Sequence, residues 1–187
     1  MALEADKWDW FWLGEGAQST AAQLEYQELD KVLDLFTLAM ALAVAWRWGD
    51  RTMRRALVGT LTLRVVGVST FLLTQQAWLL IVAPNVFENL YLMYVVFRIV
   101  AGREQMLIDR TSMLLVGAFA LGPKMAEEYF LHFLDRRPWD WVNLPVIPDA
   151  FEPRVWVGIM YFPMLLVVLV LAGRPVKPAQ SRGSPSP

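Results

Sequence analysis

The chain has 187 residues, of which 56% are hydrophobic and 19% are charged, and its formal net charge is −1 at pH 7. A soluble domain of this length usually carries more charge and a smaller apolar fraction, and no basic patch in the sequence indicates nucleic-acid binding. Because the sequence has no cysteine, it excludes disulfides, thiolate catalysis and cysteine-based metal sites.

The apolar residues cluster into blocks that are long enough to cross a bilayer, whose hydrocarbon core of about 30 Å takes about 20 helical residues. The sequence therefore predicts an all-α, polytopic transmembrane bundle. Residues 1–30 are expected to form an amphipathic, aromatic lead-in outside the membrane, and the Pro/Ser-rich residues 173–187 a disordered cytoplasmic tail. Five spans are predicted within residues 31–172, at about 31–48, 56–82, 86–101, 112–133 and 155–172.

Proline residues are expected to end one of these spans and to bend another. Span 2 is longer than a perpendicular crossing needs, and Pro84 is expected to end it. Asn85 and Glu88 then have the spacing of an N-cap and capping box at the start of span 3. Within span 4, Pro123 cannot donate to the carbonyl of Phe119, so a bend is expected there.

The orientation follows from the basic residues outside the spans. Most of them fall on the side of residues 49–55, residues 102–111 and the C-terminal tail. The positive-inside rule then places the N-terminus outside and the C-terminus in the cytoplasm. We expect an integral protein of a bacterial cytoplasmic membrane, with the lipid bilayer as its first partner.

The segment from Lys124 to His132 is the most unusual part of the chain, because it sets ionisable residues inside a predicted span and holds the only histidine. Spacing of four residues puts Lys124, Glu128 and His132 on one helix face. A charge at membrane depth costs about 2.5–3.5 kcal/mol on insertion scales, so such residues usually mark a ligand or ion site or a buried ion pair. Arg64 lies too deep in span 2 to reach the interface and needs a partner.

In this topology, polar residues of four spans fall in the outer half of the bundle, which predicts a polar site open to the outside. Our main hypothesis is that this site binds or conducts a small molecule or ion, including a lipid ligand. The predicted ligand-binding residues are Lys124, Glu127, Glu128, His132, Glu88, Arg64, Gln75 and Tyr91.

Two other functions remain open. The charges are equally compatible with structural ion pairs in an accessory subunit of a larger complex; span 5 has no ionisable residue after Val155 and is free to face lipid or a partner protein. Alternatively, paired carboxylates suit acid–base chemistry on a lipid or isoprenoid. A metal site from Glu128, His132 and Asp135 or Glu88 is not expected, because there is no second histidine. No motif identifies a cofactor.

Overall fold

The structure, a computed structural model, describes residues 20–76, 78–132 and 152–175. Within these ranges the chain forms helices and no strand, which confirms the predicted all-α class. The predicted lead-in up to residue 19 and the predicted tail from residue 176 lie outside the described residues. The helices are α2 (Thr20–Ala45), α3 (Arg51–Thr74), α4 (Trp78–Val82), α5 (Val86–Ala101), α6 (Arg110–His132) and α7 (Glu152–Ala172).

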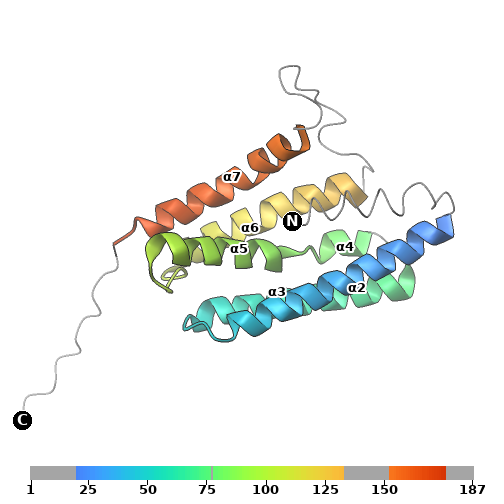
Figure 1. The fold of residues 1–187 in the computed structure, drawn as a ribbon, viewed down its shortest axis with the longest axis horizontal. Coiled ribbons are helices and arrows are strands. Elements are labelled where there is room, and N and C mark those ends of the chain that lie inside the picture. Colours follow the sequence, from blue (N-terminus) through green and yellow to red (C-terminus); the bar gives the residue numbers. More distant parts are fainter. Residues whose placement is uncertain (1–19, 77, 133–151, 176–187) are drawn as a thin grey trace, which may run out of the picture.

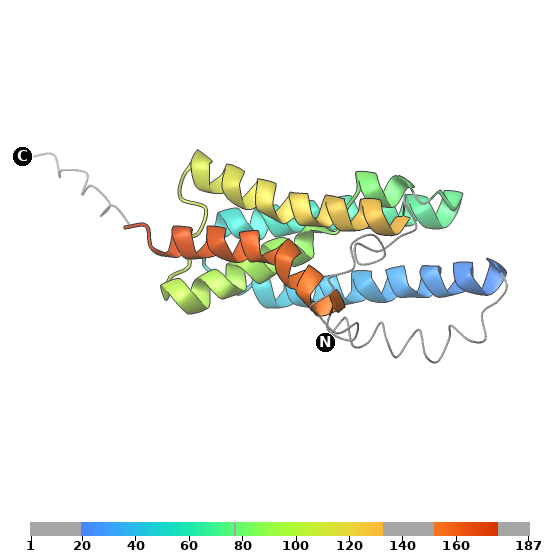
Figure 2. The ribbon, with the colours of Figure 1, turned by 90° about the horizontal axis from the view of Figure 1, so that it is seen from above.

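The helices lie side by side along one long axis (Figure 1, Figure 2). Helix α5 is central, because it packs against α2, α3, α6 and α7. Its apolar side chains Phe87, Met93, Tyr94 and Phe97 are among the largest fully buried ones in the described chain. Helix α5 therefore supplies much of the core, and any polar residue on it lies close to several other helices.

Much of the outer surface is apolar. Large apolar side chains such as Phe36 on α2, Leu73 on α3 and Phe162 on α7 are exposed. Two stretches, Arg51–Thr74 and Trp78–Ala101, are long and apolar enough to cross a membrane. An apolar surface of this kind is typical of a protein that meets lipid or another protein, so both features indicate membrane association.

The predicted bounds of span 2 are wrong at its end. Helix α3 stops at Thr74, where Gln75 adopts a left-handed conformation (φ 57°) and its N–H bonds the carbonyl of Phe71 at 2.7 Å. Figure 1 shows the chain reversing there, so that α4 and α5 return together. Pro84 does interrupt the helix, but inside the returning segment and not at the end of span 2. The reversal could not be predicted from the sequence, because a left-handed residue at the C-terminal end of a helix is usually glycine and not glutamine.

Carboxylates fix the starts of α3 and α6. Asp50 accepts bonds from the N–H groups of Thr52 (2.9 Å) and Met53 (3.0 Å). Asp109 and Ser112 cap each other: the Ser112 N–H donates to the Asp109 carboxylate (2.6 Å), and the Asp109 N–H donates to Ser112 Oγ (3.0 Å). The bond from the Ser112 N–H is the main reason that the pKa of Asp109 lies below its ordinary value.

Aromatic packing closes the end of the bundle where α3 begins. The Trp48 ring lies 5.1 Å from the Tyr91 ring and 4.6 Å from the Tyr94 ring, measured between centroids. The Arg98 guanidinium lies 5.6 Å from the Trp48 centroid and pairs with Glu104 at 3.0 Å. Arg98 therefore has both an ion partner and an aromatic partner at this end. Its position near the end of span 3 alone would suggest only that the side chain extends toward the interface.

Gly67 allows α3 to pass close to the non-helical stretch between α4 and α5. A Cβ added at Gly67 would overlap the Cβ of Ala83, whereas one added at Gly59, on the same helix, would meet nothing within 4 Å. We expect Gly67→Leu to destabilise the protein by about 1–3 kcal/mol, the usual cost of overpacking. Gly59→Leu is the matched control, and thermal unfolding of both purified variants is the measurement. Equal unfolding temperatures would contradict the close packing of Gly67 and Ala83.

Candidate functional site

The centre of the candidate site is the non-helical stretch Ala83–Asn85 between α4 and α5. All three residues are buried. Backbone away from water needs polar partners for its N–H and C=O groups. The Ala83 N–H bonds the carbonyl of Leu79 at 3.1 Å, and the Ala83 carbonyl accepts a bond of 3.0 Å from Nη1 of Arg64. The buried guanidinium of α3 thus stabilises the break in the neighbouring segment.

Arg64 has a carboxylate partner on α2. Its Nη2 lies 3.6 Å from Oδ2 of Asp34, and only 3% of the Arg64 side chain is exposed. A guanidinium this deeply buried is strongly destabilising without a counter-charge. The sequence indicated that Arg64 needs a partner, and Asp34 supplies it.

Asn85 connects this ion pair to α5. Its Nδ2 lies 3.4 and 3.3 Å from the two carboxylate oxygens of Asp34 and 3.5 Å from Oε2 of Glu88. The two carboxylates fix the orientation of the amide, because the opposite orientation would set its oxygen against them. The predicted capping box is therefore wrong: Asn85 precedes α5, but its side chain makes no capping bond to the helix.

Lys124 on α6 continues the set of contacts. Its Nζ lies 2.9 Å from Oε2 of Glu127 and 3.6 Å from Oε2 of Glu88, and 10% of its side chain is exposed. The Tyr161 hydroxyl on α7 donates to Oε2 of Glu127 at 3.4 Å. Two carboxylates from different helices thus share one lysine.

We call these linked side chains the polar network. It joins helices α2, α3, α5, α6 and α7, and it holds three carboxylates against two cations, a formal charge of −1 when all are ionised. Glu88 is its most open member, since half of its side chain (50%) is exposed. In order of contact, the network consists of Arg64, Asp34, Asn85, Glu88, Lys124, Glu127 and Tyr161.

The amide oxygen of Asn85 is an unused acceptor in the network. Oδ1 of Asn85 is buried and has no hydrogen-bond partner among the described residues. A buried acceptor without a donor is costly, by about 1–3 kcal/mol, so such an atom needs a structural or functional explanation. Asn85 therefore offers an acceptor to a bound group that carries N–H or O–H donors.

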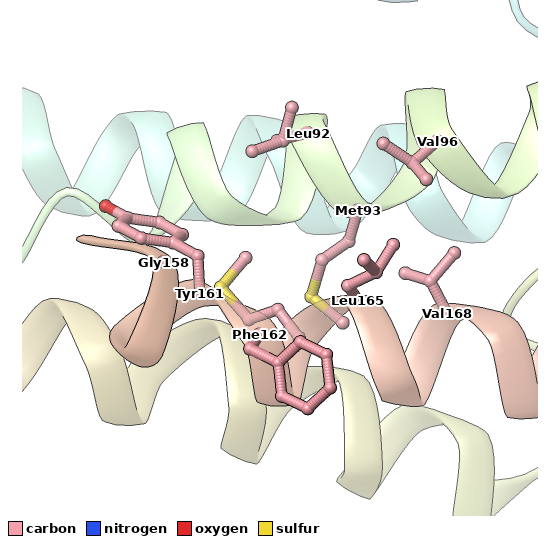
Figure 3. Close-up of a pocket in the computed structure, with 9 residues that line it drawn as sticks. Leu92, Met93, Val96, Gly158, Tyr161, Phe162, Leu165 and Val168 are labelled. Atoms are coloured by element: carbon pink, nitrogen blue, oxygen red, sulfur yellow. The ribbon is translucent and has the colours of Figure 1, made fainter. Parts of the chain in front are cut away.

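An apolar groove lies beside the network, between α5 and α7 (Figure 3). Its volume is about 360 Å³, within the range of about 300–1,000 Å³ that is common for small-molecule sites. Tyr161 belongs to both features, because its ring lines the groove and its hydroxyl bonds Glu127. The groove is lined by Leu92, Met93, Val96, Gly158, Tyr161, Phe162, Met164, Leu165 and Val168.

The structure brings four of the predicted site residues into the polar network. Tyr91 instead stacks on Phe87 (6.0 Å between centroids) and on Trp48 in the aromatic cluster. Gln75 ends α3, and its exposed amide donates to the carbonyl of Leu72. Glu128 and His132 belong to α6, but their side chains lie outside the described residues. The four residues brought together are Lys124, Glu127, Glu88 and Arg64.

Three members of the network are not among the predicted ligand-binding residues. Asp34 is an acidic residue inside the first predicted span, which is the property that selected Glu88 and Arg64. Asn85 was assigned to a helix cap, although a polar residue next to a proline inside an apolar segment also indicates a broken helix. Tyr161 was expected only as one of several aromatic residues that could line the apolar part of a lipid site, since one tyrosine in an apolar helix is common.

Among the described residues, no group of three His, Cys, Asp or Glu side chains is arranged to hold a metal ion. Comparisons of the chain with protein-family models, with curated proteins and with solved structures find no match. The arrangement of the side chains is therefore the basis for assigning a function.

Removal of Asp34 tests the buried ion pair. Loss of one partner of such a pair costs about 3–5 kcal/mol, and we expect Asp34→Leu to fall at the lower end, because Ala83 still accepts a bond from Arg64. The double variant with Arg64→Leu should lose less stability than the sum of the two single variants. Chemical unfolding of all three variants in detergent measures this coupling; strictly additive losses would show that the two side chains do not interact.

Proposed function

We propose that the chain is an integral membrane protein that binds a small cationic group at the open side of the polar network. In this proposal α2, α3, the α4–α5 segment, α6 and α7 are five spans, with the N-terminus outside and the C-terminus in the cytoplasm of a bacterial cell. The three spans outside the two most apolar stretches have 26, 23 and 21 residues. At 1.5 Å per residue each exceeds the roughly 30 Å of a hydrocarbon core.

The broken helix supports a site at membrane depth. Non-helical backbone inside a membrane is tolerated only where it is buried in protein or lines a hydrated cavity, and broken spans in transporters commonly carry the binding site. Here the break at Ala83–Asn85 coincides with the charged residues of three neighbouring helices. Two markers of an intramembrane site therefore occur together.

The charge of the network favours a cation. Arg64 and Lys124 are both engaged by carboxylates, whereas Glu88 is half exposed and shares its lysine with Glu127. The observation that carries the proposal is Asn85, which directs Nδ2 to Glu88 and leaves its buried Oδ1 without a hydrogen-bond donor. An ammonium group supplies both positive charge and N–H donors.

Binding is favoured over conduction, because large buried side chains fill the bundle between the network and the end where α3 begins. The side chains of Tyr94, Phe97 and Met106 are almost completely buried, and Trp48 packs over Tyr94. These side chains would block a cation that enters beside Glu88 from passing to the end of the bundle where α3 begins. In this proposal the site is reached from one side only.

The topology has a direct test, because the natural chain has no cysteine and gives no background labelling. We expect Gln76→Cys to react with a membrane-impermeant maleimide in intact cells, and Ile108→Cys only after the membrane is opened. Both positions are exposed. The cysteine-free parent is the control. The reverse labelling pattern would overturn the proposed orientation, and labelling of both variants in intact cells would overturn the number of spans.

The binding site is tested with butylammonium as the probe. We expect saturable binding by calorimetric titration of the purified chain, weakened at least tenfold in Glu88→Gln, since a hydrogen bond to a charged group contributes about 1.5–3 kcal/mol. Glu104→Gln is the matched control, because it removes a similarly exposed carboxylate from the opposite end. Unchanged binding in a folded Glu88→Gln protein would contradict the proposed site.

One observation favours a second function, that of an accessory subunit. The network ties five helices together, and the outer face of α7 exposes Ile159, Phe162 and Leu166 to lipid or to a partner protein. In that case Glu88→Gln would lower the abundance of the protein or release a co-purifying partner, without any effect on cation binding. Catalysis on a lipid or isoprenoid stays a prediction of the sequence.

A further inference from the structure

We infer that the cationic group belongs to an amphiphile, with an ammonium head at the polar network and a hydrocarbon chain in the groove between α5 and α7. This inference rests on the proposed function, because the head group occupies the same site. It adds the chemical class of the ligand and the location of its apolar part.

The groove begins at the network. Glu88, Leu92 and Val96 are spaced four residues apart and therefore follow one face of α5; the first belongs to the network, and the other two line the groove. At 1.5 Å per residue they span about 12 Å. A ligand bound at Glu88 thus has a continuous apolar wall beside it.

Helix α7 forms the opposite wall in the same order. Tyr161 stands at the polar end, with its hydroxyl bonded to Glu127, and Leu165 and Val168 follow along the helix. Figure 3 shows Leu92, Met93 and Val96 of α5 across the groove from Leu165 and Val168 of α7. Both walls therefore change from polar to apolar in the same direction.

The dimensions suit one hydrocarbon chain. The groove volume is about 360 Å³, and the distance of about 12 Å along α5 from Glu88 to Val96 is close to one leaflet of a hydrocarbon core about 30 Å thick. Apart from the Tyr161 hydroxyl, the side chains that line it are apolar. A second polar group on the ligand would have no partner there, so a simple alkyl chain fits best.

The head group is assigned by charge and donors. Glu88 and Glu127 both contact Lys124, and Asn85, whose amide oxygen is unused, contacts Glu88 through Nδ2. An ammonium donates to carboxylate and amide oxygens alike. A sulfate or phosphate head would meet carboxylates and an acceptor, with one nearly buried lysine that is already paired.

The experiment compares butylammonium, octylammonium and octyl sulfate as probes of the full-length chain in a non-ionic detergent, with affinities referred to free aqueous concentration. Burial of one methylene corresponds to about 0.8 kcal/mol, roughly a fourfold change in affinity. We therefore expect octylammonium to bind at least tenfold more tightly than butylammonium, and octyl sulfate not to bind.

A groove-filling variant localises the hydrocarbon chain. Leu165 lines the apolar part of the groove, one turn beyond Tyr161, and is exposed. Leu165→Trp should remove the advantage of octylammonium and leave butylammonium binding unchanged. Leu169→Trp, at a similarly exposed position of the same helix but outside the groove, is the matched control. Val96→Trp serves the same purpose from the opposite wall if Leu165→Trp does not fold.

The outcomes separate the two proposals. Equal affinity for both ammonium probes, with Glu88→Gln still weakening each, would overturn the hydrocarbon chain in the groove and leave the cation site standing. Octyl sulfate binding as tightly as octylammonium would overturn the ammonium head group. Loss of all Glu88-dependent binding would overturn the cation site and the inference with it.

Discussion

The hydrogen bond from Arg64 to the carbonyl of Ala83 is the interaction on which the rest of the structure depends. The break between α4 and α5 exposes backbone in an apolar interior, where an unpaired carbonyl costs about 1–3 kcal/mol. Gly67, one turn beyond Arg64, lets α3 come close enough to Ala83 for this bond to form. The guanidinium that satisfies the break must itself be neutralised, and Asp34 of α2, which is only partly buried, supplies the counter-charge.

The need to neutralise the two buried cations explains only part of the network. Asp34 neutralises Arg64, and Glu127 neutralises Lys124, so two carboxylates would satisfy the two cations. Glu88 is a third carboxylate, half exposed, beside an asparagine with an unused acceptor. Buried ion pairs specify how helices are arranged more often than they add stability. An unneeded negative charge and a free acceptor are better explained by a ligand than by helix register.

The sequence predicted the helices well and their connections less well. The helix predicted over residues 86–101 is confirmed as α5. The prediction succeeded because a proline precedes this helix and a glycine follows it. The reversal at Gln75 was missed, since no glycine or proline marks it and the apolar run continues to Val82. Four site residues were found because a charge inside an apolar segment is conspicuous. The contacts of Asp34 with Arg64 and of Tyr161 with Glu127 came only with the structure, since the rotation of each helix about its axis decides which side chains meet.

The polar network and the apolar groove would contribute differently to the selectivity for a ligand. A hydrocarbon chain that leaves lipid for an apolar groove exchanges one apolar environment for another, so little hydrophobic driving force distinguishes it from neighbouring lipid chains. Carboxylates in a region of low dielectric interact far more strongly with an ammonium than they do in water. The head group at Glu88 and Glu127 would therefore select the amphiphile. The groove, which meets the network at Tyr161, would set the direction of its chain.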